Sequence, residues 1–206
     1  GGSLLTDDER LARRAHSLID CGRAKDPEEK EFTFGANYRL GELHAALLLC
    51  ALERLPGQQA ERAEAAGYFQ ELAGELDGVA LLPPDRRITR WSFYRYIVLI
   101  EPEAFAGTTN RRGCEALEAE GVGAWEGYEP MSRYDLFQPG LSRLPVAVEH
   151  AARLDPARMS FPVAEDAGLR RTVYLDENVF RAGRRGIEDA VEALAKVQRH
   201  AGELAG

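Results

Sequence analysis

The sequence predicts a fold of the α/β or α+β class. Segments with apolar residues at helical spacing alternate with short stretches rich in aromatic and β-branched residues, which are typical of strands. Proline and glycine separate most of these segments, and no internal repeat or low-complexity stretch interrupts the order. We therefore expect a small layered domain in which helices pack on strands.

The first helix is expected directly after residue 6. Thr6 is a suitable N-cap, and Glu9 follows three residues later, where its side chain can reach back to the cap. Gly22 offers a stop for this helix. One helical face is apolar, at Leu11, Ala15, Leu18 and Ile19. Residues 3–5 are expected to form a short buried strand, and the charged residues 23–32 a surface loop.

Two further helices are expected on either side of Pro56-Gly57. The first begins near Leu40, and its apolar side carries Leu43, Leu47, Cys50 and Ala51. Proline interrupts a helix interior but is well placed in the first turn of a new helix. The second helix is therefore expected to run from this point to Gly78.

The second half of the chain alternates strands with helices. Strands are expected within residues 79–84, 90–100, 122–130 and 173–175. Helices are expected at 109–121, 145–153, 161–171 and 185–204, with irregular structure through most of 130–162.

Charge and composition argue against several classes of function. The 206 residues carry a formal net charge of -8, and the basic residues are scattered among acids, so neither a nucleic-acid groove nor binding to an anionic membrane is expected. The three cysteines lie far apart and form no C-x-x-C pair, which supports neither a zinc site nor a disulfide framework. Without a secretory leader or an apolar run long enough to span a bilayer, the expected location is the cytoplasm.

No assembled catalytic centre or metal site is recognisable in the residues themselves. The serines occupy no G-x-S-x-G elbow, and no glycine-rich phosphate loop is present. The histidines are isolated from one another, at His16, His44, His150 and His200. The lysines, Lys25, Lys30 and Lys196, do not lie in the apolar setting that makes a lysine nucleophilic.

Residues 33–48 place Gly35, Asn37 and Arg39 immediately before an apolar helix. One explanation is that Asn37 caps the helix beginning near Leu40. Another is that the loop holds an anion at the helix start, where free N–H groups and the helix dipole favour negative charge. The residues alone leave both explanations open.

The chain resembles the DegT/DnrJ/EryC1/StrS family of aminotransferases, which use pyridoxal 5'-phosphate (PLP). The family pattern of G-G, T-D-D, G-x-N-Y-R and E-x-x-A-A is matched by Gly1-Gly2, Thr6-Asp7-Asp8, Gly35, Asn37-Tyr38-Arg39, Glu42 and Ala45-Ala46. Residues 90–100, Arg111 to Val122 and Tyr128-Glu129-Pro130 also fit, so the resemblance covers nearly the whole chain, most specifically residues 1–55. Residues 161–180 lean toward the aminocyclitol and aminohydroxybenzoate branches.

This resemblance implies an α/β protein with the aspartate-aminotransferase fold (PLP fold type I). Residues 1–55 would be the end of the large PLP-binding domain, and residues 56–206 the small C-terminal domain. The implied protein is a homodimer that moves an amino group from glutamine or glutamate to a keto-sugar or keto-cyclitol, as in antibiotic or cell-surface sugar biosynthesis. The Schiff-base lysine would lie upstream of Gly1, so the chain would be a carboxy-terminal half that carries no catalytic lysine and is inactive alone.

The resemblance also assigns candidate site residues. In relatives, the asparagine of the G-x-N-Y-R loop reaches the cofactor phosphate of the neighbouring subunit, which implies cofactor binding by Asn37 and Gly35. Arg39 is expected at the rim of the active site, and Tyr128 and Arg133 are expected to contact the hydroxyls of the substrate ring. For the last two residues, an exposed loop position without a role is the alternative. The alternative for the whole protein is a non-catalytic member that keeps the fold for dimerisation or ligand sensing.

Overall fold

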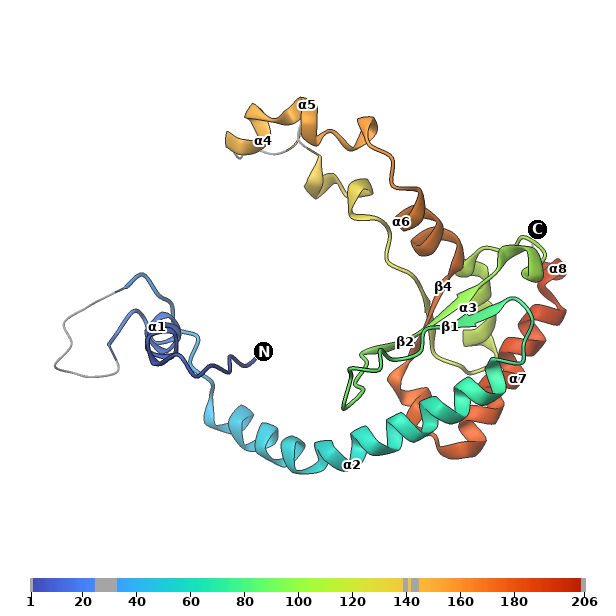
Figure 1. The fold of residues 1–206 in the computed structure, drawn as a ribbon, viewed down its shortest axis with the longest axis horizontal. Helices are drawn as coiled ribbons and strands as arrows, with labels where there is room; N and C mark the ends of the chain where they lie inside the picture. The colour runs from blue at the N-terminus through green and yellow to red at the C-terminus, as the bar shows by residue number, and fades with distance from the viewer. Residues whose placement is uncertain (1, 25–32, 139–140, 142–144, 205–206) are drawn as a thin grey trace. The chain divides into compact units, whose positions relative to one another are not determined.

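The computed structural model describes residues 2–24, 33–138, 141 and 145–204, which fall into two compact units. Unit 1 is Gly1–Pro56 and unit 2 is Gly57–Gly206. The division falls within helix α2, Glu42–Ala73 (Figure 1). The assignment of these parts to a large and a small domain stays a prediction.

Helix α1, Glu9–Ile19, is capped by Asp8. The Asp8 carboxylate accepts hydrogen bonds from the backbone N–H groups of Arg10 and Leu11, at 2.9 and 3.1 Å. The prediction that Thr6 caps this helix was therefore wrong. A carboxylate can accept two N–H groups and also interacts favourably with the helix dipole, whereas the Thr6 hydroxyl accepts only the N–H of Asp8.

The strand expected at residues 3–5 is also absent, and Leu4 and Leu5 are exposed. A strand needs a neighbouring strand to satisfy its backbone groups. The only pairing that the structure describes in unit 1 is an isolated bridge between Asp20 and Asn37. Apolar character alone therefore misled the prediction at this point.

Helix α2 runs without interruption through Pro56, so the predicted break at Pro56-Gly57 was wrong. Proline removes one N–H from the helix ladder, a local penalty of about 3 kcal/mol. The flanking residues are mostly leucine, alanine, glutamate and glutamine, which favour helix on both sides. The helix ends at Ala73, and Gly78 turns the chain into the first strand with a φ of +66°.

Unit 2 contains a four-stranded sheet with the order β1-β2-β4-β3, in which all neighbours are antiparallel. The strands are β1 (Val79–Leu81), β2 (Arg95–Ile100), β3 (Ala124–Glu126) and β4 (Thr172–Asp176). The first three lie within segments expected to form strands, and β4 extends one residue beyond its predicted segment at each end. The α/β class is confirmed, although the strands are shorter than most of the predicted segments.

The expected helices of unit 2 are present in altered form. The helix expected from residue 109 is present as α3, and Thr109 is its N-cap. The helices expected at 145–153 and 185–204 are each divided into two α-helices. The helix expected at 161–171 is an α-helix followed by a π-helical turn at Ala167–Arg171. The α-helices are α3 (Asn110–Ala119), α4 (Pro145–Glu149), α5 (Ala151–Leu154), α6 (Pro162–Asp166), α7 (Gly183–Arg199) and α8 (Ala201–Leu204). Among the described residues, no helix combines the length and the apolar character that crossing a bilayer requires.

The core of unit 2 lies between one face of the sheet and the helices. Alternate residues of β2, namely Tyr96, Val98 and Ile100, are buried. They pack in one cluster with apolar side chains of α2, α3 and α7, including Phe69, Leu117, Ile187 and Leu194. Since successive strand residues point to opposite faces, Ile97 and Leu99 belong to the face that the core does not cover.

Buried Asn110 ties the start of α3 to the π-helical turn and to β4. Its side-chain amide donates hydrogen bonds to the carbonyl oxygens of Gly168 and Thr172, both at 3.0 Å. Gly168 lies in the turn, and Thr172 is the first residue of β4. One side chain therefore provides hydrogen bonds to two backbone carbonyl groups at the junction between the π-helical turn and β4.

We expect Asn110→Ala to lower the free energy of unfolding by about 1–3 kcal/mol, because both carbonyl oxygens would lose a partner. Denaturant unfolding followed by circular dichroism measures the change. Arg112→Ala is the matched control on the same helix, since its side chain forms only an exposed ion pair with Glu115 at 3.3 Å and should alter stability by at most about 1 kcal/mol. Equal losses in both variants would contradict the role of Asn110.

Buried Cys114 should resist thiol reagents while the exposed Cys21 and Cys50 react. Burial, with smaller contributions from nearby glutamates, raises the pKa of Cys114 from 9.0 to about 12. The stabilising contribution of the protonated thiol is therefore complete below pH 9.0 and is lost as the pH rises toward 12. Labelling followed by mass spectrometry tests the reactivity, and in Cys114→Ala the alkaline decline of stability should be shallower. Rapid labelling of Cys114 in the folded chain would refute this.

Candidate functional site

The loop of residues 33–38 lies against the C-terminal end of α1. Backbone hydrogen bonds join Ala36 N–H to the Leu18 carbonyl and Tyr38 N–H to the Ile19 carbonyl, both at 2.9 Å. In the reverse direction, Cys21 N–H donates to the Ala36 carbonyl at 3.1 Å. This ladder fixes the position of the residues that precede α2.

Gly35 allows this close approach of two backbone segments. A Cβ atom at Gly35 would lie 2.6 Å from the nitrogen of Gly22 and 2.8 Å from the carbonyl oxygen of Leu18. Gly22 has a φ of +80°, and a Cβ there would overlap the carbonyl of Thr33. Packing within unit 1 is thus sufficient to require glycine at position 35, whether or not a cofactor lies near it.

Asn37 and Arg39 form one hydrogen-bonded group with Asp20. The Nη1 atom of Arg39 donates to Oδ1 of Asp20 at 2.9 Å, and its Nε donates to Oδ1 of Asn37 at 3.2 Å. Because an arginine only donates, this contact orients the Asn37 amide with its oxygen toward Arg39. The Asn37 amide nitrogen has no hydrogen-bond partner among the described residues, and the side chain is exposed. The pair thus offers an amide donor next to a guanidinium group.

The structure rejects the explanation that Asn37 caps the next helix. Helix α2 begins at Glu42 rather than near Leu40. Asn37 therefore lies five residues before the first helical residue, whereas an N-cap directly precedes it. Instead, its backbone forms the isolated bridge with Asp20.

The other two predicted site residues belong to unit 2. Tyr128 follows β3 and is 70% exposed, and its ring centre lies 5.8 Å from that of Tyr174 in β4. Arg133 lies in a short 3₁₀ turn, where its guanidinium is 3.6 Å from the Glu165 carboxylate. These contacts place the two residues on different neighbours and do not join them to each other. Asn37, Gly35 and Arg39 belong to unit 1, so the predicted site residues are divided between the two units.

Sequence reasoning did not single out a group around Arg95. Its Nη1 atom lies 2.5 Å from Oδ1 of Asp176, and its guanidinium carbon lies 5.1 and 5.2 Å from the ring centres of Trp125 and Tyr94. These residues come from β4, from β3 and from the position before β2. Only the strand order and register bring them together, so no spacing in the sequence could have revealed the group.

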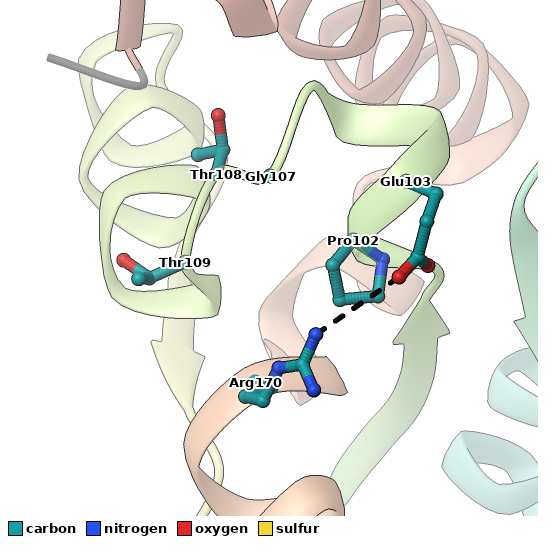
Figure 2. A pocket seen from close by; sticks show the side chains of 6 residues that line it. All are labelled: Pro102, Glu103, Gly107, Thr108, Thr109 and Arg170. Atoms are coloured by element: carbon teal, nitrogen blue, oxygen red, sulfur yellow. Dashed lines mark ion pairs between the residues drawn. The ribbon is translucent and has the colours of Figure 1, made fainter.

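A shallow pocket lies at the N-terminal end of α3 (Figure 2). Its polar groups already have protein partners: Thr108 donates to the Ala201 carbonyl at 2.9 Å, and Thr109 caps α3. Arg170 lies 4.0 Å from Glu103, the pair marked in Figure 2, and 3.4 Å from Asp166. The polar side chains of this pocket therefore stabilise the fold, and nothing in their contacts indicates a ligand site.

Within the described ranges, no group of three histidine, cysteine, aspartate or glutamate side chains is placed to hold a metal ion. Lys196 is the lysine that these ranges contain, and its Nζ atom lies 2.7 Å from both carboxylate oxygens of Glu120. Lys25 and Lys30 lie outside the described residues. Lys196 of α7 therefore forms an ion pair with Glu120, the C-cap residue of α3.

Comparison with known proteins identifies aminotransferases as similar to this chain. The family model of the DegT/DnrJ/EryC1/StrS aminotransferase family matches residues 1–172. The chain is 32% identical over 209 residues to L-glutamine:scyllo-inosose aminotransferase of Streptomyces griseus, covering 96% of this chain and 49% of that protein. It is 31% identical over 218 residues to L-glutamine:2-deoxy-scyllo-inosose aminotransferase of Micromonospora echinospora, covering 100% and 51%. The chain spans about half the length of these curated relatives.

Solved structures show the same similarity. The crystal structure of 3-amino-5-hydroxybenzoic acid synthase superposes with a TM-score of 0.71 at 26% identity, covering 93% of this chain and 47% of that one. Helicobacter pylori PseC, an aminotransferase involved in the biosynthesis of pseudoaminic acid, gives a TM-score of 0.70 at 22% identity, covering 94% and 47%. The fold is therefore that of about half of a PLP aminotransferase.

We expect Gly35→Ala to displace the loop from α1, because the new methyl group meets backbone atoms that cannot move independently. Overpacking of this kind costs about 1–3 kcal/mol. Amide hydrogen exchange should speed up at Ala36 and Tyr38, whose N–H groups bond to α1. Gly41→Ala is the matched control, since its Cβ would meet only a side-chain nitrogen of His44, at 3.3 Å. Unchanged exchange in Gly35→Ala would show that the loop tolerates a side chain there.

Proposed function

The chain belongs to the DegT/DnrJ/EryC1/StrS aminotransferase family, and on that premise we propose that the protein is a PLP-dependent enzyme of the cytoplasm. We propose that it transfers an amino group from glutamine or glutamate to a keto-cyclitol or keto-sugar. The names of the Streptomyces griseus and Micromonospora echinospora relatives both pair glutamine with an inosose, which supports the cyclitol as acceptor.

The observation that carries this proposal is the Asn37–Arg39–Asp20 group. A phosphate needs hydrogen-bond donors held in place, and charge-assisted hydrogen bonds are the strong ones. Asn37 offers an exposed, oriented amide donor, and Asp20 keeps the Arg39 guanidinium beside it. The residues therefore fit the phosphate group of PLP. When bound, the cofactor would supply the electron sink for amino transfer.

Each residue then has a defined task. Asn37 donates an N–H group to the phosphate in the neighbouring subunit of a homodimer, and Gly35 keeps the loop flat against α1. Arg39 lies at the rim of the site, where its charge orients anionic groups of the amino donor. Tyr128 and Arg133 donate hydrogen bonds to hydroxyls of the acceptor ring. We assign no catalytic residue in this chain, and the Schiff-base lysine is proposed to lie upstream of Gly1.

The exposed apolar side chains of α2 support the proposal of a homodimer. In unit 1, the first half of this helix exposes several leucines, at Leu43, Leu47, Leu48, Leu49 and Leu52. Contiguous exposed apolar surface of this kind is typical of protein contacts. Further protein, from another subunit or another domain, is therefore expected to cover it.

We expect Asn37→Ala in the complete homodimeric enzyme to weaken PLP binding by about ten- to a hundredfold, because a charge-assisted hydrogen bond contributes about 1.5–3 kcal/mol. PLP titration measures the affinity, and thermal melts of the cofactor-free form show whether stability changes. Arg23→Ala is the control, since Arg23 pairs with the same carboxylate of Asp20 at 3.7 Å without contacting Asn37. Undiminished affinity in Asn37→Ala would refute the assignment of Asn37 to the cofactor phosphate.

Mixed dimers test whether the contact crosses the subunit boundary. Asn37→Ala subunits are combined with subunits that lack the Schiff-base lysine but keep Asn37. The one site with a lysine then receives Asn37 from the other chain, so its PLP affinity should return to normal. If confirmed mixed dimers do not recover that affinity, the asparagine acts within its own subunit.

A further inference from the structure

One face of the sheet in unit 2 is not covered by the helices that form the core. We call it the open face. By register it carries Arg95, Ile97, Leu99, Trp125, Tyr174 and Asp176, together with Ala80 and the buried Thr172, which both pair with Leu99. Ile97 pairs with Tyr174, which pairs in turn with Trp125, so these three side chains form one row across three strands.

The open face is unusually aromatic for a surface. Trp125 is 51% exposed, and Ile97 and Tyr174 in the same row are half-buried. The exposed ring of Tyr128 lies against Tyr174 and extends the row. An antiparallel sheet that faces water on one side normally alternates apolar and polar residues. The row Ile97–Tyr174–Trp125 departs from this pattern, which indicates a binding surface.

An ion pair lies beside the aromatic row. Arg95 and Asp176 are paired across β2 and β4, and their side chains remain 21% and 33% exposed. Gly123 makes room for the carboxylate, because a Cβ there would lie 2.7 Å from Oδ2 of Asp176. Arg95 has further N–H groups beyond the one that reaches Asp176, and the carboxylate has further lone pairs.

These polar groups decide what kind of occupant fits. An apolar protein surface laid on the open face would remove them from water without giving them partners, and such desolvation is costly. A six-membered ring that carries hydroxyls satisfies both parts of the surface. Its C–H groups pack on the aromatic rings, while its hydroxyls donate to Asp176 and accept from Arg95. Ligand sites combine apolar walls with a few placed polar groups in this way.

We propose that the open face binds the hydroxylated ring of the acceptor substrate. Trp125 and Tyr174 give the apolar contacts, and Arg95, whose guanidinium carbon lies 5.1 Å from the centre of the Trp125 ring, and Asp176 are the hydroxyl partners. The proposal rests on the proposed function for the identity of the ring and extends it to residues outside the 35–39 loop. It also gives Tyr128 a physical role as the edge of the same surface.

Binding of myo-inositol to the 206-residue chain tests the proposal directly. Saturation-transfer NMR and titration calorimetry should show saturable binding. Trp125→Ala removes an apolar contact, and Arg95→Met keeps the aliphatic stem but removes the donors. Each variant should weaken binding by about tenfold or more, as expected for the loss of one well-placed contact. Trp125→Tyr, which keeps an aromatic ring, should retain most of the affinity.

Arg111→Met is the matched control. Arg111 forms an ion pair with Glu126 of β3 at 2.9 Å, and Glu126 pairs with Val173, so this ion pair belongs to the helix side of the same sheet. Its loss should leave binding unchanged. Absence of saturable binding, or equal affinity in Trp125→Ala and the unchanged chain, overturns the proposal. If the variants alter sedimentation instead of ring binding, the open face is a protein contact, which also overturns it.

Failure of this proposal is distinguishable from failure of the proposed function. Ring binding without amino transfer in the complete protein would leave the open face as a polyol site and refute the aminotransferase. Conversely, the complete protein could transfer amino groups with a KM for the acceptor that Trp125→Ala leaves unchanged. That result would refute the open-face proposal and leave the proposed function intact.

Discussion

The alternation of buried and exposed residues along β2 is the constraint on which the rest of unit 2 depends. Tyr96, Val98 and Ile100 fill the core, and a register shift of one residue would turn all three away from the helices. The Tyr96 ring stacks on Phe180 at 4.8 Å and meets Phe69 edge-on at 5.3 Å. Once these three residues face the core, the alternating residues Arg95, Ile97 and Leu99 must lie on the opposite face of the sheet. The core therefore determines where Arg95 lies.

Unit 1 depends on a different constraint, the approach of two backbone segments that contain Gly22 and Gly35. Because neither position has room for a side chain, the loop can bond directly to the end of α1. Asp20 lies at this junction and holds Arg39, which in turn orients Asn37. The position of one exposed amide thus follows from steric requirements at residues that never contact a ligand.

The sequence predicted what local chemistry determines. The strand within 90–100 was recognisable from its aromatic and β-branched residues, and the helix expected at 109–121 was recognisable from its pattern. Errors arose where competing local choices differ little in energy, as between Thr6 and Asp8, or where a long helix tolerates one proline. The loop at 35–39 stood out from its glycine, asparagine and arginine before a helix, but its expected role in cofactor binding came from the resemblance to a family. The Arg95 group could not be found, because its members are separated by up to about 80 residues and meet only through strand pairing.

The chain has two tryptophans, and the sheet separates them. Trp91 packs against Tyr96 on the core side, while Trp125 stands half exposed on the other. Indole emission shifts to longer wavelength as water gains access to the ring. The two residues therefore report on different events in one spectrum: the blue component follows loosening of the core, and the red component follows whatever covers the opposite surface. The protein carries an intrinsic optical label for each side of its sheet.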